Sequence, residues 1–260
     1  MMVDFIFGHW AIMEALRAGR RQIDQFLVSE TIEEKGTTAD ILATAAEKNV
    51  NVKRVPRRIL DDLVPSGANH QGMVMRVNDY PYSTVEDILA LAKRRAERPF
   101  LMLLDLLKDP QNVGSLMRVA DAVGVHGVII QDRRGVAITP AVVNASSGAV
   151  EHLHVVQVTN LSQTMKTLKE QDIWLVGMDI GPNVPPIDKT DLNMSLGIVL
   201  GSEGEGMRRL VRDTCDMLLC LPMRGAVASL NVATVGSVAL YAAWQARGWN
   251  GWAHAEKPNL

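Results

Sequence analysis

The sequence predicts an α/β protein in which a small α/β domain precedes a larger domain built on a parallel β-sheet. Apolar runs of strand length alternate along the chain with longer segments whose apolar residues recur at helical spacing. This alternation is typical of parallel strands joined by helices that cover both faces of a sheet. The chain has 260 residues, of which 47% are hydrophobic, so it is long enough for one large domain or two modest ones.

Residues 1–77 are predicted to form the smaller domain, which is close to the minimum size for independent folding. A helix over residues 8–18 has apolar side chains at helical spacing, and a second helix over residues 37–48 offers Thr37 or Thr38 as its N-cap. Short strands are predicted at residues 23–28, 50–55 and 73–77.

Residues 78–98 are predicted to form a linker that contains one helix. Pro81 is followed by a helix-like segment with acidic residues early and basic residues late, an order that suits the helix dipole. The basic end, residues 93–98, fits either a solvated helix face or a contact with nucleic-acid phosphates.

Residues 99–260 are predicted to form the larger domain. Its last helix, over residues 230–247, is apolar nearly all round, so a second face needs a cover beyond the helix's own sheet. We therefore predict an obligate homodimer, the alternative being a helix wholly buried in one monomer. The strands of this domain are predicted at residues 100–104, 127–131, 153–158, 173–178, 197–200 and 217–221.

Charge, cysteine and histidine patterns exclude several classes of protein. A formal net charge of −2 excludes a generally basic nucleic-acid coat. Cys215 and Cys220 match neither redox nor zinc spacing, and Cys220 is expected to be a buried free thiol. His152 and His154 would share a strand face but lack a third ligand, so we predict no metal site. No apolar segment reaches the roughly 18–20 residues of a membrane span and no signal peptide is visible, so we expect a cytoplasmic protein.

The first motif, DLLKDPQNVGSLMRVA over residues 105–120, joins a predicted strand to a helix predicted over residues 112–123. Its polar turn falls at the strand end, where an α/β sheet carries its chemistry, and it brings Asn112 and Arg118 to that rim. Taken singly, Asn112 reads as a helix cap and Arg118 as an exposed helix arginine.

The second motif, IVLGSEGEGM over residues 198–207, is a strand followed by glycines that would let the backbone approach a ligand closely. A dinucleotide-binding loop has the opposite glycine spacing and an early position in the sheet, which argues against a nucleotide-dependent oxidoreductase. Taken alone, the motif also fits a purely structural glycine turn.

The third motif, LPMRGAVASLNVA over residues 221–233, follows the last predicted strand. Pro222 ends that strand, Gly225 bends the loop, and Ser229 is predicted to cap the final helix.

The three motifs, in this order and with the spacing Asn112-x-Gly114-x-x-x-Arg118, resemble those of the SpoU/TrmH family of RNA ribose 2′-O-methyltransferases. The resemblance implies a SPOUT catalytic domain over residues 99–260, with a deep trefoil knot and S-adenosyl-L-methionine as cofactor. It also implies that residues 1–77, through the segments GHWAIMEAL and HQGMVMRV, form an RNA substrate-binding domain.

Within the family, the two-domain build is most similar to members that methylate a guanosine of 23S rRNA in the peptidyl-transferase region. A tRNA guanosine target and a catalytically inactive RNA-binding protein remain as alternatives. The intact Asn112, Arg118, Ser229 and Asn231 argue against the inactive protein, and Ala233 departs from the SLNVS that relatives often have.

The resemblance also implies roles for individual residues. Asn112 would position the substrate, and Arg118 would act on the ribose 2′-hydroxyl, either by stabilising the developing alkoxide or by holding the adjacent phosphate. Glu203, Ser229 and Asn231 would line the site, and the cofactor would be held by Gly201, Gly204, Leu221, Met223 and Leu230. The candidate RNA contacts are Arg17, Arg20, Arg21, Lys53, Arg54, Arg57 and Arg58.

Overall fold

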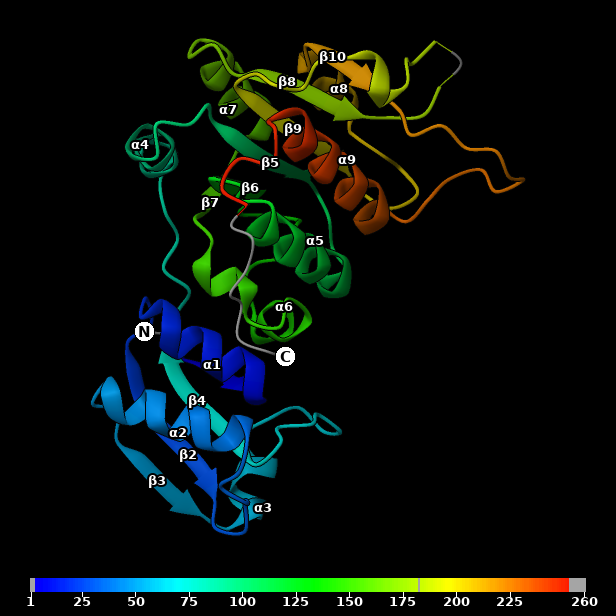
Figure 1. Cartoon of the computed structure of the whole chain (residues 1–260). Helices are drawn as coiled ribbons and strands as arrows, with labels where there is room; N and C mark the ends of the chain where they lie inside the picture. The colour runs from blue at the N-terminus through cyan, green and yellow to red at the C-terminus, as the bar shows by residue number, and fades with distance from the viewer. Residues whose placement is uncertain (1–2, 182, 253–260) are drawn as a thin grey trace.

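The computed structural model describes residues 3–181 and 183–252. Its first sheet has four strands, β1 (Val3–Phe7), β2 (Ile23–Ser29), β3 (Val52–Val55) and β4 (Met73–Asn78), in the order β1-β4-β2-β3. β4 pairs antiparallel with both neighbours, whereas β2 and β3 are parallel. Helices α1 (His9–Ala18) and α2 (Thr37–Glu47) cover one face of this sheet, and the short α3 (Arg57–Asp61) packs on the other (Figure 1).

The helices of this first unit follow the predicted apolar spacing, but their ends differ. α1 buries Ala11, Ile12, Ala15 and Leu16 and ends at Gly19, whose φ of 62° is readily adopted by glycine. The predicted threonine cap of α2 is wrong, because Gly36 occupies the N-cap position and makes no side-chain cap. Strand β1 escaped prediction because its five residues lie at the start of the chain, where no preceding turn marks it.

The second sheet has six strands in the order β10-β8-β9-β5-β6-β7, and every paired neighbour is parallel. The predicted parallel sheet is therefore confirmed. Strands β5 and β6 are buried along their whole length, as expected for a sheet covered on both faces. The strands are β5 (Phe100–Asp105), β6 (Gly127–Gln131), β7 (Val155–Val158), β8 (Trp174–Met178), β9 (Leu196–Gly201) and β10 (Met217–Leu219).

Helices cover both faces of this sheet (Figure 1). On one face pack α5 (Pro110–Ala122), α6 (Pro140–Ala145) and the last helix α9 (Val232–Ala246). On the other pack α4 (Val85–Arg94), α7 (Leu161–Lys169) and α8 (Arg209–Thr214). Two short 3₁₀ helices, η1 (Ala149–His152) and η2 (Ile187–Lys189), complete the fold.

The histidine and cysteine predictions meet mixed outcomes. His152 lies in η1 and His154 precedes β7, so the prediction that they share a strand face is wrong. Among the described residues, no group of three or more metal-ligating side chains is assembled. Cys220 is half-buried and its thiol donates to the carbonyl of Val184, 3.3 Å away. No helix in the described ranges is both long and apolar enough to cross a bilayer.

Candidate active site at the carboxyl edge of the parallel sheet

Three loops meet at the carboxyl edge of the six-stranded sheet. They follow β5, β9 and β10, which are the strands that precede the three sequence motifs. Because parallel strands all end at the same edge, the first motif comes together in space with the other two, although Asn112 is 91 residues from Glu203 and 119 from Asn231. Figure 1 shows the third loop, residues 220–231, projecting from the body of the domain.

A hydrogen-bonded bridge of side chains joins the three loops. The Asn112 amide donates from Nδ2 to Glu203 Oε1 at 2.5 Å and accepts at Oδ1 from Asn231 Nδ2 at 3.0 Å. Asn231 uses its own Oδ1 to accept from the backbone N–H of Ala233 at 2.7 Å. Each amide therefore has a donor and an acceptor engaged, which fixes its orientation.

The caps of the two helices at this site correct two predictions. The N-cap of α9 is Asn231, not Ser229, and its side chain accepts from Ala233 N. Helix α5 is capped by Asp109, which leaves Asn112 free of a capping role. Ser229 lines the cleft instead and makes no hydrogen bond with another described residue.

The glycine motif folds into a tight loop that closes on itself. Ser202 and Gly206 exchange two backbone hydrogen bonds of 3.1 and 2.9 Å, and Gly204 at the tip has a φ of 81°. A Cβ on Gly201 would lie 2.1 Å from the backbone of Gly206 and Met207. The small size of Gly201 thus lets the loop return against its own strand.

A buried carboxylate anchors the far end of this loop. Asp105 is the last residue of β5, and its side chain is fully buried. It accepts from the backbone N–H of Arg208 at 2.8 Å and from Arg208 Nε at 2.9 Å. This role of Asp105 was not predicted, although an aspartate that ends a run of five apolar residues is a usable signal.

The loops enclose a cleft of about 500 Å³, a volume within the range of small-molecule sites. Apolar side chains from β8, the third loop and α9 form much of its wall, and backbone from the glycine loop forms the rest. Glu203 and Glu205 place carboxylates at the same cleft, a charge that suits a cationic ligand. The predicted residues that line it are Gly201, Glu203, Gly204, Leu221, Met223, Ser229, Leu230 and Asn231.

Arg118 lies apart from this cleft. It is six residues beyond Asn112 on α5, a rotation of about 240°, so the two side chains leave different faces of the helix. The exposed guanidinium donates from Nη1 to the hydroxyl of Ser147, 3.4 Å away. Gly114 between them permits a close crossing of α5 and α6, because a Cβ there would lie 2.4 Å from that of Ala145.

The basic residues predicted to contact RNA fall into two groups, one exposed and one buried or half-buried. Arg17, Lys53, Arg54, Arg57 and Arg58 are exposed, with Arg17 paired to Glu14 and Arg54 paired to Glu34.

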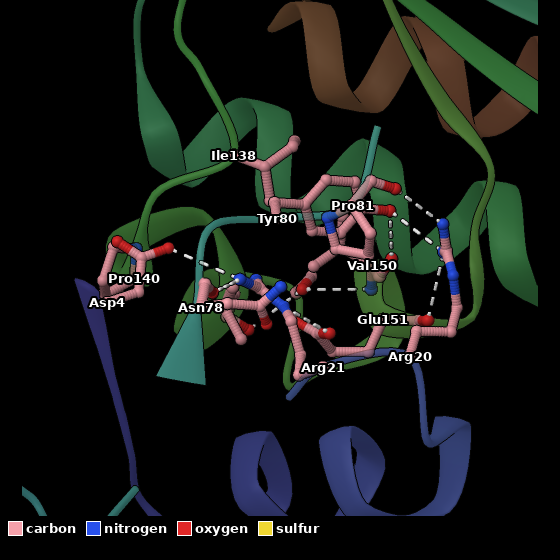
Figure 2. Close-up of polar contacts among 12 residues, drawn as sticks. Asp4, Arg20, Arg21, Asn78, Tyr80, Pro81, Ile138, Pro140, Val150 and Glu151 are labelled. Carbon is pink, nitrogen blue, oxygen red and sulfur yellow. Dashed lines mark hydrogen bonds and ion pairs between the residues drawn. The ribbon is translucent and has the colours of Figure 1, made fainter. Parts of the chain in front are cut away.

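The prediction is wrong for the other two. Arg21 is only 6% exposed and Arg20 is half-buried, because both guanidinium groups bond to the second domain and the segment that joins it. Figure 2 shows the side chain of Arg20 directed toward Pro81 and that of Arg21 directed toward Glu151 and Asn78.

Comparison with known families divides the chain at the same place as its two sheets. The model of the SpoU rRNA Methylase family matches residues 99–241, which contain the six-stranded sheet, the cleft and the three motifs. A second model, described as RNA 2′-O ribose methyltransferase substrate binding, matches residues 5–83.

Similar proteins span almost the whole chain. YacO of Bacillus subtilis, named as a TrmH family tRNA/rRNA methyltransferase, is 40% identical over 94% of this chain and 96% of its own length. A TrmH family protein of Staphylococcus saprophyticus is 40% identical over 95% of this chain and 97% of its own. The crystal structure of the SpoU methyltransferase AviRb from Streptomyces viridochromogenes, in complex with AdoMet, has the same fold, with a TM-score of 0.78 and 24% identity over 95% of this chain and 91% of AviRb.

Proposed function

The chain belongs to the SpoU rRNA methylase family and is an RNA methyltransferase, and from this premise we propose that it methylates the ribose 2′-hydroxyl of a guanosine in 23S rRNA. The 2′-oxygen as acceptor is supported by the match of residues 5–83 to a substrate-binding model of RNA 2′-O ribose methyltransferases. The two-domain build and the third motif resemble the RlmB subfamily, which supports the rRNA guanosine over a tRNA target.

One observation carries the proposal: the bridge from Glu203 through Asn112 to Asn231. It ties the glycine loop and the α9 loop to the start of α5, so the three motifs act as one preorganised unit. Positioning of this kind supplies a large part of the rate in a group transfer, because the reacting atoms are held in line before reaction. The bridge also argues against an inactive RNA-binding protein, which has no need of these groups in register.

The cleft fits S-adenosyl-L-methionine, the cofactor that AviRb binds in the same fold. Its apolar wall suits the adenine ring, and the carboxylates of Glu203 and Glu205 suit the positive charge of the sulfonium and ammonium groups. The cofactor supplies an already electrophilic methyl group. Gly201, Leu221 and Leu230 hold it chiefly through backbone groups, with Gly204 and Met223 at the edge of the cleft.

Arg118 serves the RNA side of the reaction in this proposal. A guanidinium stays protonated at neutral pH and makes a poor general base. Arg118 instead stabilises the developing alkoxide or holds the neighbouring phosphate, which shares the proton. Its exposed position on α5, outside the cofactor cleft, supports a contact with RNA.

The proposal assigns residues 1–77 to RNA binding, residues 78–98 to the connection and residues 99–260 to catalysis, in the cytoplasm. The exposed Arg17, Lys53, Arg54, Arg57 and Arg58 are the RNA contacts that remain in the first domain. The trefoil knot of the SPOUT class belongs to the proposal too.

We also propose a homodimer through α9. This helix buries one face, including Gly236, Leu240 and Ala243, yet leaves Val238 and Tyr241 45% and 44% exposed. Apolar side chains of this size on adjacent turns favour cover by a second copy. Sedimentation of the full chain at micromolar concentration tests this, and a stable active monomer would refute it.

Transfer of labelled methyl groups tests the main proposal. The purified protein is incubated with labelled S-adenosylmethionine and, separately, with unmodified 23S rRNA and unmodified tRNA. We expect one 2′-O-methylguanosine in the 23S rRNA. Label in the tRNA alone would establish the alternative substrate, and a protein that binds RNA and the cofactor without transfer would establish the inactive alternative.

A further inference from the structure

The boundary between the two domains is built as a polar clamp rather than a flexible joint. The clamp centres on residues 146–152, hereafter the seam segment, which runs from the end of α6 through η1. Helix α1 of the first domain packs directly on this segment. Gly148 permits the contact, because a Cβ there would lie 2.7 Å from that of Glu14 and 2.9 Å from the carbonyl of Trp10.

Arg21 and Glu151 form the buried centre of the clamp. Both side chains are fully buried, and the guanidinium meets the carboxylate through two bonds, from Nε at 3.0 Å and from Nη2 at 2.9 Å (Figure 2). The remaining nitrogen, Nη1, donates to the carbonyl of Asn78 at 2.8 Å. Such a fork-to-fork pair fixes direction as well as distance, so it sets the angle between the domains.

Arg20 and Tyr80 fasten the chain segment between the domains to the same place. Arg20 donates to the carbonyls of Pro81 and Glu151, at 2.9 and 3.3 Å, and also to that of Leu153. The hydroxyl of Tyr80 donates to the carbonyl of Leu153 at 2.7 Å, and burial raises the pKa of Tyr80, which keeps the hydroxyl a donor. The start of the predicted linker is therefore held by hydrogen bonds where it leaves the first domain.

The seam segment touches the proposed catalytic arginine on its other side. Ser147, one residue before Gly148, accepts the bond from Arg118. The clamp holds this segment from the first domain while Arg118 rests on it from α5. Arg21 therefore pairs with Glu151 near one end of the seam segment, and Arg118 contacts Ser147 near the other. Between them the segment is held by the backbone hydrogen bond from Glu151 N to the carbonyl of Gly148 at 2.9 Å.

We propose that Arg20, Arg21 and Glu151 are positioning residues, which seat the substrate-binding domain at a fixed angle and thereby hold Arg118 in register with the RNA that this domain presents. The proposal rests on the proposed function, because its catalytic readout is methyl transfer to RNA. Binding of the cofactor lies outside it, since no residue of the clamp lines the cleft.

The test replaces the buried ion pair by apolar side chains of similar length, in the double variant Arg21→Met/Glu151→Met. Removing both charges together leaves no fully buried charge unpaired, and Asp4, which Arg21 also contacts at 3.5 Å, is 24% exposed and can be solvated, so the variant is expected to keep its fold. The variant loses, however, the two hydrogen bonds that fix the direction of the contact between the domains. We expect a Kd for S-adenosylmethionine within twofold of wild type, while kcat for 23S rRNA falls on the order of 100-fold, as small misplacements of reacting groups do. Amide hydrogen exchange in the seam segment should accelerate.

A matched control and a second variant keep the test decisive. Arg76→Gln removes an arginine ion pair, with Asp24 at 3.7 Å, that lies wholly within the first sheet, and it should change neither kcat nor exchange in the seam segment. Should the double variant not fold, Arg20→Met removes the bonds from this side chain to the carbonyls of Pro81, Glu151 and Leu153 without stranding a buried charge, and the same criteria apply.

The outcomes separate this proposal from the proposed function. Wild-type kcat or unchanged exchange of the seam segment in a folded clamp variant would overturn the clamp. Failure of the wild-type protein to methylate any RNA would overturn the proposed function, and the exchange data would then decide alone whether the clamp orders the seam segment.

Discussion

The cleft and the seam are both built from polar side chains, but the two regions use them in opposite ways. At the cleft, Glu203, Asn112 and Asn231 bond to one another in a single chain and stay accessible to solvent and ligand. At the seam, Arg21 and Glu151 pair with each other, the remaining nitrogen of Arg21 donates to the carbonyl of Asn78, and both side chains are fully buried. Side chains at the cleft keep donors and acceptors free for a ligand, whereas those at the seam use theirs in bonds between the two domains.

The difference shows why an arginine near a substrate-binding domain is not evidence of a substrate contact. A buried charge is tolerated only with a partner, so a buried arginine indicates that a carboxylate or several carbonyl oxygens accept its hydrogen bonds. Exposed arginines such as Arg57 and Arg58 are solvated and need no partner within the protein, so they remain available to bind phosphate.

The largest effect should come from breaking one half of the seam. Glu151→Ala strands the Arg21 guanidinium in a buried site, and we expect a loss of about 3–5 kcal/mol in the free energy of unfolding. Urea unfolding measures it. Glu34→Ala is the control, since it removes the exposed partner of Arg54 and should cost about 0–1 kcal/mol. Equal costs for the two variants would show that the seam pair is no more important than a surface pair.

Removing the arginine proposed for chemistry should have the next largest effect. Arg118→Ala takes away a cation placed outside the cofactor cleft, so we expect methyl transfer to fall by about 10²–10³-fold while cofactor affinity holds. Single-turnover kinetics and calorimetry measure the two quantities. Arg209→Ala, which removes a 96% exposed side chain on α8, should leave both unchanged. Wild-type turnover in Arg118→Ala would remove this residue from the mechanism.

Two glycines of the cleft loop should differ in a way that the structure alone explains. Gly201→Ala forces a Cβ into the returning backbone and should weaken cofactor affinity by about tenfold or more, because the loop must open. A Cβ on Gly204 would have no atom within 4 Å, so Gly204→Ala should raise the free energy of the loop conformation only through its positive φ, by about 1 kcal/mol. Calorimetry with S-adenosylmethionine compares them, and a larger loss at Gly204 would contradict the loop geometry.

The smallest effect concerns a second ion pair across the seam, between His152 and Glu14 at 2.7 Å. The hydrogen bond raises the pKa of His152 above 6.5 and lowers that of Glu14 below 4.5, with Arg17, Asp121 and Glu151 as neighbouring charges. Its stabilisation is therefore full between pH 4.5 and 6.5, and is lost as pH rises through the raised pKa of His152 or falls through the lowered pKa of Glu14.

Because this pair is partly exposed, we expect it to contribute about 1 kcal/mol or less. Urea unfolding of wild type and His152→Gln should differ more at pH 6 than at pH 8.5. A difference that grows toward pH 8.5 would show that the histidine is not held in its charged form.

Much of the fold could be predicted because it depends on short-range pattern. The predicted strand at residues 127–131 has the bounds of β6, and the other five predicted strands of the second sheet have ends within two residues of the observed ones. Apolar period and turn residues are local properties, so they survive without knowledge of the neighbours. The cleft residues were found by the resemblance of their motifs, since an isolated asparagine or glycine carries too little signal.

Partners distant in sequence could not be predicted. Ser229 looked like the cap of α9, but two residues later Asn231 bonds both to Ala233 and to Asn112, which lies 119 residues earlier in the chain. Asp105 could not be linked to Arg208 for the same reason, at a separation of 103 residues. The sequence shows which hydrogen-bonding groups are present, and only the folded structure shows which of them bond to each other.

The sequence by itself determined the parallel α/β architecture and the three motif loops at one edge, because strand order and apolar period follow from local residue choice. The tertiary structure decided which arginines stay exposed and which hold the domains together. Arg17 and Arg21 are four residues apart and chemically identical, yet one is solvated and the other is buried against a carboxylate 130 residues away. The physical reason is desolvation: whether a charge keeps its water depends on what packs over it, and that is settled only when the two domains close on each other.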